Sequence, residues 1–339
     1  MPFDDLMLRH RARRRQVLLA LAGGSALTAA PVWGRTPEAP LPVVATFSIL
    51  GDMLREVGGE RVAVTTIVGV NGDVHRFEPS PRDAKALLEA RVLVLNGLDF
   101  ETWLPRLVQA SGFAGQQVLA SDGVPVRRLN AEEGHDGHEH DAAPNDDDAH
   151  GDHAHDGHAH GEADPHAWQS LENGMIYARN IARGLAQADP RNAAYYASRA
   201  ESYISRMRAL DNEIRTGFAA IPKERRRVIT AHDSFGYFGD AYGIEFIPVA
   251  GLSNQAEPSA ADLARIVRIT RESRVSGIFI ENMTNPALAQ QIARETGVLM
   301  GGTLYADALG PADEPAGTYL GMVSWNAGRL LYVLRQAGN

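Results

Sequence analysis

The chain has 339 residues, 44% of them hydrophobic and 22% charged, which is the composition of a globular protein with one large or two medium cores. It contains no cysteine, which excludes thiolate zinc sites, iron–sulfur clusters, disulfides, cysteine nucleophiles and a lipid-modified cysteine, so any metal must be bound by its 12 His and its carboxylates. The formal net charge is −9 and no basic stripe stands out, so we expect no nucleic-acid partner.

Residues 1–34 have the pattern of a signal peptide. Five Arg precede a short apolar run at residues 17–30, and small residues at 32–34 offer a cleavage site. The run is too short to span a bilayer, although an N-terminal membrane anchor is the alternative. Arg14 and Arg15 also fit a twin-arginine signal, with Val17 in place of the usual Phe, so the Sec and Tat export routes both stay open. We expect the mature chain in the bacterial periplasm.

The first part of the mature chain alternates short apolar runs with helical patterns. Residues 43–47, 62–68 and 92–95 are predicted strands, and residues 80–90 and 98–110 are predicted helices. This alternation is typical of βαβ units with a parallel sheet. We therefore expect an N-terminal α/β lobe at residues 35–188.

Within this lobe, residues 132–164 form a His- and Asp-rich stretch. It carries 12 Asp and Glu, no Lys or Arg, and almost no large apolar side chain, so it cannot form a core and is expected to be a disordered loop. Its histidines can bind divalent metal weakly. They are His135, His138, His140, His150, His153, His155, His158 and His160. A metal-gathering loop is the functional interpretation, and a charged spacer is the alternative.

Residues 189–221 predict a linking helix. From Ala193 onward, apolar residues recur at helical spacing until Pro222 ends the pattern. About 28 residues of helix span about 42 Å, which is long enough to brace two lobes. The aromatic and methionine stripe of this helix is interpreted as core packing.

The chain then returns to the alternating pattern. Predicted strands lie at residues 228–230, 246–249, 278–280 and 298–304, and predicted helices at 234–242, 259–274, 286–296 and 318–335. Residues 222–339 are therefore expected to form a C-terminal α/β lobe, which gives two lobes of ordinary domain size.

Outside the signal and the His-rich stretch, the sequence has three histidines: His75, His166 and His232. Each precedes a predicted helix, and His232 follows the strand at 228–230, where α/β folds place their ligands. A lone histidine in such a place is usually a cap or a surface residue. Three of them beside a His-rich stretch favour a metal site.

These segments resemble the solute-binding proteins of zinc and manganese ABC transporters, the ZnuA/TroA-like group of cluster A-I. The resemblance covers nearly the whole mature chain and several motifs in family order. The motifs are His75-Arg76-Phe77-Glu78-Pro79-Ser80-Pro81, Asp164-Pro165-His166-Ala167-Trp168, His232-Asp233-Ser234-Phe235-Gly236-Tyr237-Phe238, Glu257-Pro258-Ser259-Ala260-Ala261-Asp262-Leu263 and Leu304-Tyr305-Ala306-Asp307-Ala308-Leu309.

The resemblance implies two Rossmann-like lobes joined by one long helix, with a metal between them. It implies His75, His166, His232 and Asp307 as ligands, an inner-membrane ABC permease as partner, and a monomer. Motif spacing and residues 96–101 look closest to the AztC-type subgroup, which implies a periplasmic zinc metallochaperone as a further partner. The sequence departs from many relatives at Val74, where they have Pro before the first ligand.

Three imidazoles and one carboxylate suit Zn²⁺ and fill four positions, which leaves little room for a catalytic water. We therefore expect zinc delivery and no enzymatic activity. Manganese or mixed uptake, metal storage or chaperoning, and a zinc hydrolase remain alternatives, although the sequence has no His-Glu-x-x-His motif.

Acidic residues near the ligand motifs are candidates to orient the imidazoles. They are Glu78, Asp164, Asp233 and Glu281. Helix capping is the competing interpretation for Asp164 and Asp233. Trp168 and Phe235 are expected to pack around the site.

Overall fold

A computed structural model describes residues 39–129, 163–248, 260–284 and 286–336 of the chain. Contacts between residues place Ala39–Asn339 in one compact unit. The predicted signal peptide, the eight histidines of the His-rich stretch and residues 257–259 of the fourth motif lie outside the described residues. No helix in the described part of the chain is long and apolar enough to cross a membrane.

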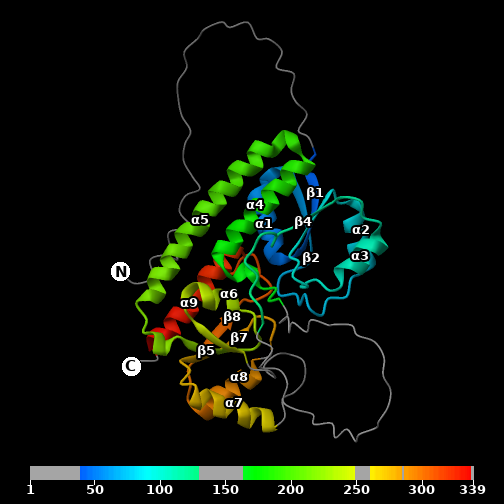
Figure 1. Cartoon of the computed structure of the whole chain (residues 1–339). Helices are drawn as coiled ribbons and strands as arrows, with labels where there is room; N and C mark the ends of the chain where they lie inside the picture. The colour runs from blue at the N-terminus through cyan, green and yellow to red at the C-terminus, as the bar shows by residue number, and fades with distance from the viewer. Residues whose placement is uncertain (1–38, 130–162, 249–259, 285, 337–339) are drawn as a thin grey trace, which may run out of the picture. The chain divides into compact units, whose positions relative to one another are not determined.

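The first lobe is built on a four-stranded parallel sheet (Figure 1). Its strands are β1 (Leu41–Phe47), β2 (Val62–Val68), β3 (Val92–Leu95) and β4 (Gln116–Leu119), in the order β2-β1-β3-β4. The crossovers carry α1 (Ser48–Gly58), α2 (Pro81–Glu89) and α3 (Leu104–Ser111). The central strands β1 and β3 are almost wholly buried, as parallel strands covered on both faces are.

The second lobe repeats this arrangement. Its strands are β5 (Arg227–Thr230), β6 (Glu245–Pro248), β7 (Gly277–Glu281) and β8 (Met300–Leu304), in the order β6-β5-β7-β8 and all parallel. The helices of this lobe are α6 (Gly236–Tyr242), α7 (Ala260–Glu272), α8 (Ala287–Thr296) and α9 (Tyr319–Gln336). The α/β class with two parallel-sheet lobes is thereby confirmed.

Two antiparallel helices connect the sheets. Helix α4 (Leu171–Ala188) packs against α5 (Ala193–Ala219), and α5 contacts α1 of the first lobe as well as α6 and α9 of the second (Figure 1). The 27 residues of α5 span about 40 Å. Its buried face carries the predicted aromatic and methionine stripe, including Tyr203, Met207 and Phe218. The exact domain boundaries at residues 188 and 221 stay predictions.

The helix predicted at residues 98–110 begins only at Leu104, so this prediction was wrong in its first half. Leu98 and Asp99 have φ of +54° and +58°, which no helix accommodates. The buried carboxylate of Glu101 causes this turn, because it accepts the N–H groups of Asn96 and Gly97 at 2.7 and 3.1 Å. Strand β4 was missed, because its alternating burial leaves Val118 as its one fully buried side chain.

A buried carboxylate joins α1 to the start of α9. Asp52 Oδ2 accepts the backbone N–H of Tyr319 at 2.9 Å, and the Asp52 side chain is 9% exposed. Burial raises the pKa of Asp52 to about 6, although the Tyr319 hydrogen bond acts in the opposite direction. The folded chain therefore binds this proton more tightly than the unfolded chain.

We expect Asp52→Asn to raise the free energy of unfolding of the metal-free protein by about 1–2 kcal/mol at pH 7.5 and by about half as much at pH 5. The stability of the wild type falls as pH rises through about 4 to 6, because the unfolded chain loses this proton first. Asparagine keeps an acceptor for Tyr319 without the buried charge. Urea denaturation at both pH values measures the difference. Equal destabilisation at both pH values would contradict the assignment.

Candidate metal site

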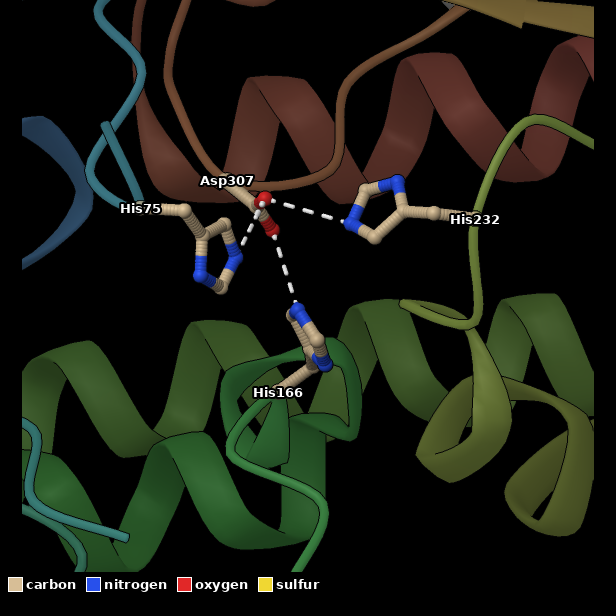
Figure 2. Close-up of side chains that lie close together, drawn as sticks. All are labelled: His75, His166, His232 and Asp307. Carbon is tan, nitrogen blue, oxygen red and sulfur yellow. Dashed lines mark ion pairs between the residues drawn. The ribbon is translucent and has the colours of Figure 1, made fainter. Parts of the chain in front are cut away.

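Four side chains from separate segments of the chain converge on one point (Figure 2). His75 lies in the loop after β2, and His166 directly precedes the 3₁₀ turn η5 (Ala167–Gln169). His232 follows β5, and Asp307 follows β8. Strands β2, β5 and β8 thus present these residues at their carboxyl ends, where α/β sheets bind ligands. One potential ligand atom from each of the four lies within 4.8 Å of the others.

The carboxylate of Asp307 is the centre of the cluster. Its Oδ2 lies 3.4 Å from Nε2 of His75 and 3.3 Å from Nε2 of His232, and its Oδ1 lies 3.5 Å from Nε2 of His166. Asp307 is fully buried and His166 nearly so, whereas the side chain of His75 is 43% exposed. The site is therefore reached past His75.

Several buried polar atoms of the cluster have no hydrogen-bond partner among the described residues. They are both carboxylate oxygens of Asp307 and Nε2 of His166 and His232. A buried carboxylate without donors is costly, and the distances above exceed those of ordinary N–H···O hydrogen bonds. Two donors bound at about 2.0–2.1 Å to one tetrahedral ion lie about 3.3 Å apart, so the three oxygen–nitrogen separations fit donors to one shared divalent ion, while the four candidate atoms as a set lie within 4.8 Å of one another.

Two further carboxylates orient the imidazoles. Asp164 Oδ1 lies 2.8 Å from Nδ1 of His166, and Glu281 Oε2 lies 2.6 Å from Nδ1 of His232. With Nδ1 of His166 protonated toward Asp164, this ring directs the lone pair of its Nε2 at the centre of the site. His232 and Glu281 form a close ion pair, in which Glu281 Oε2 has no hydrogen-bond partner among the described residues. His75 has no such partner among the described residues. Its N–H donates to Asp73, and its ring packs edge-on against Phe100 at 5.0 Å.

The four predicted orienting carboxylates thus have different surroundings. Asp164 and Glu281 contact ligand-candidate imidazoles, whereas Asp233 lies 3.9 Å from Arg127, and Glu78 is exposed in a groove between α2 and α3. Trp168 is buried, with its ring 5.4 Å from that of His166. Phe235 instead stacks on Phe246 inside the second lobe.

Sequence reasoning missed Arg127. Its guanidinium lies 3.1 Å from Asp164 Oδ2 and 3.3 Å from Asp240 Oδ2, so it holds the carboxylate that orients His166. No motif or spacing pointed to this residue.

Charges in the cluster shift the proton affinities strongly. Burial alone would raise the pKa of Asp307, but the neighbouring imidazoles hold it well below its usual range. Burial would lower the pKa of His232, but the charges of Glu281 and Asp307 raise it well above its usual value. The pKa of His75 is raised as well: burial lowers it, but the hydrogen bond to Asp307 and the negative charge of that carboxylate have the larger combined effect. Without metal, the cluster therefore favours imidazolium facing carboxylate.

Comparison with known proteins agrees with this architecture. The family model of ZnuA, the periplasmic component A of a zinc-uptake complex, matches residues 43–331. A manganese-binding lipoprotein MntA of Halalkalibacterium halodurans is 31% identical, over 87% of this chain and 89% of that protein. The manganese ABC transporter substrate-binding lipoprotein PsaA of Streptococcus pneumoniae is 28% identical, over 84% and 86%.

Solved structures show the same fold. The periplasmic zinc-binding protein TroA of Treponema pallidum has a TM-score of 0.72 at 26% identity and covers 87% of this chain and 99% of its own. A manganese-bound periplasmic metal-binding protein of Candidatus Liberibacter asiaticus has a TM-score of 0.71 at 25% identity, over 86% and 98%.

The two lobes and the converging side chains define a solute-binding protein of the ABC transporter type. The chain belongs to the ZnuA family, the metal-binding proteins of cluster A-I, which work with a membrane permease and its ATPase.

We expect Glu281→Gln to weaken zinc binding by about 10–100-fold, because the neutral amide supports the His232 ring less well. Competition with a chromophoric chelator at pH 7.5 measures the affinity. Glu245→Gln is the matched control, since Glu245 lies in the same lobe and pairs at the surface with Arg227. Equal affinities of the two variants would contradict the role of Glu281.

Proposed function

We propose that this chain is a periplasmic, high-affinity zinc-binding protein that delivers Zn²⁺ to the permease of an ABC uptake transporter. The proposal rests on one observation above all: three imidazole Nε2 atoms face a buried carboxylate that has no donor of its own among the described residues. We assign His75, His166, His232 and Asp307 as the four ligands.

The donor set supports zinc over manganese. Imidazole nitrogen suits Zn²⁺, whereas Mn²⁺ prefers sites rich in oxygen ligands, and zinc is also the higher of the two in the general affinity order. At this site three donors are nitrogen and one is oxygen. The two orienting carboxylates contact Nδ1 atoms and so increase the basicity of the rings.

Manganese uptake, or uptake of both metals, is the second candidate. The relatives favour it, since MntA and PsaA are both manganese proteins by name. A storage protein and a zinc hydrolase are weaker candidates. Four protein ligands leave no open position for a catalytic water, so we propose a non-enzymatic role.

The membrane permease is the partner that the family implies, and we expect a monomer. A periplasmic zinc metallochaperone as a second partner rests on the AztC-type resemblance alone. The eight histidines of residues 132–164 are assigned a weak, auxiliary metal-gathering role.

Competition titration of metal-free protein with Zn²⁺ and Mn²⁺ tests the metal, and deletion of residues 133–160 tests the His-rich stretch. The deletion is practicable because Arg128 and Ala163 pair across its base. We expect one tight zinc per chain in both proteins, not displaced by manganese, with weak additional zinc lost in the deletion. Tight manganese binding would favour the second candidate. Loss of the tight zinc on deletion would favour storage.

Zinc affinity should fall by about 10–100-fold from pH 7 to pH 6, because zinc must displace protons from imidazoles whose pKa values are raised. Each displaced proton contributes up to about tenfold per pH unit. Chelator competition across this range measures the slope. His232→Ala should have a shallower slope than the wild type. A pH-independent affinity would show that these imidazoles do not bind the zinc.

A further inference from the structure

The segment that carries Asp307 belongs to the second lobe by its place in the sequence, but most of its backbone hydrogen bonds are made with the first lobe. Residues 306–309, here called the Asp307 segment, follow β8 of the second lobe. The hydrogen bonds of Ala306 and Leu309, on either side of Asp307, nevertheless run to residues of the first lobe and η5, and within this segment Ala308 has the one bond to the second lobe.

On the N-terminal side of Asp307, the carbonyl oxygen of Ala306 accepts two hydrogen bonds. Trp168 Nε1 donates at 2.9 Å and Gln169 Nε2 at 2.8 Å. Both side chains are completely buried, as is Ala306. One peptide group adjacent to Asp307 is thus fixed to the turn that directly follows His166.

On the C-terminal side, Leu309 is bound through both of its backbone polar groups. Its N–H donates to Ser48 Oγ at 2.9 Å, and its carbonyl accepts the N–H of Asn71 at 2.9 Å. Further along, Tyr319 donates its N–H to Asp52 and its hydroxyl to the carbonyl of Trp168. Two contacts join this region to the second lobe. Tyr305, before Asp307, exchanges two hydrogen bonds with Asn326. The carbonyl of Ala308, after Asp307, accepts a long hydrogen bond of 3.3 Å from Asn282.

His232 is supported differently. Its N–H and Nδ1 both contact Glu281, and its carbonyl accepts a long hydrogen bond from Thr230, so all three contacts stay within the second sheet. The contact between the lobes that is adjacent to His232 is the Arg127–Asp233 pair at 3.9 Å, and it contributes little because Asp233 is 37% exposed. Stronger contacts begin five residues later in α6, where Tyr237 Oη accepts the N–H of Arg127 at 2.8 Å and donates to the carbonyl of Asp164 at 3.3 Å. Asp240 of the same helix pairs with Arg127 at 3.3 Å.

We propose that Trp168 and Gln169 are positioning residues for Asp307, and that the metal site is therefore divided three to one. His75, His166 and Asp307 form a half-site on the first lobe, and His232 is the one ligand carried by the second lobe. Metal exchange begins with detachment of His232. This inference rests on the proposed function, since it concerns the same four ligands.

The first test replaces the two donors to Ala306 with apolar side chains, in the variant Trp168→Phe/Gln169→Met. We expect zinc release to excess chelator to be at least tenfold faster, and the visible absorption spectrum of bound Co²⁺ to change. Trp325→Phe is the matched control, because it removes an equivalent 2.9 Å bond from Trp325 Nε1 to the carbonyl of Thr303 within the second lobe. Release at the wild-type rate, or an equal effect of the control, would overturn the positioning role.

The second test follows amide hydrogen exchange of the unmodified protein with and without one equivalent of Zn²⁺. We expect zinc removal to accelerate exchange at residues 230–236 at least tenfold and to leave Leu309 and Tyr319 within about threefold. Parallel acceleration of both regions, or of neither, would overturn the division.

Failure of the proposed function is separable from failure of this inference. The wild-type titration alone reports whether a tight zinc site exists. The exchange rate of Leu309 in the metal-free double variant reports the anchoring independently of metal, and an unchanged rate there would overturn it.

Discussion

The buried carboxylate of Asp307 is the constraint on which the arrangement of the two lobes depends. Its oxygens receive no hydrogen bond from the described residues, and an isolated charge in such a place would cost several kcal/mol. Three imidazoles from different segments offset that cost, either as imidazolium ions or by sharing a cation with it. The lobes must therefore approach closely enough for His232 and His75 to face the same carboxylate.

The two orienting carboxylates form a second layer of charge around the imidazoles. Asp164 and Glu281 are fully or almost fully buried, and each contacts the rear nitrogen of an imidazole. Three carboxylates thus surround three rings, and Arg127 compensates Asp164 from outside. A dication at the centre can take the place of the protons on these rings and also bind the oxygen atoms of Asp307, which have no donor among the described residues. The same charges that raise the pKa values of His75 and His232 attract the metal that replaces their protons.

Much of this architecture was predictable from the sequence, because apolar runs and helical patterns alternate regularly and three isolated histidines stand at strand-to-helix junctions. Asp307 followed only from the family resemblance, since nothing local distinguishes it from other aspartates. Long-range hydrogen bonds were not predictable: Glu101, whose carboxylate forms the turn before α3, also accepts the hydroxyl of Thr46, 55 residues away. The bonds from Trp168 and Gln169 to Ala306 span 138 and 137 residues, which no periodicity reveals.

The two sheets share one strand order, yet they contribute unequally to the site. Helix α5 contacts both lobes and opposes a wide hinge motion, while metal exchange requires that the ligand sphere be opened. Both requirements are met if the first lobe holds three of the four ligands and the second lobe holds one. The peptide groups around Asp307 stay bonded to the first lobe, so a small displacement of the loop after β5 suffices to withdraw His232. The metal would then face solvent past His75, whose side chain is the most exposed of the four. A rigid helix α5 and a ligand that detaches readily, His232, are therefore compatible in one fold.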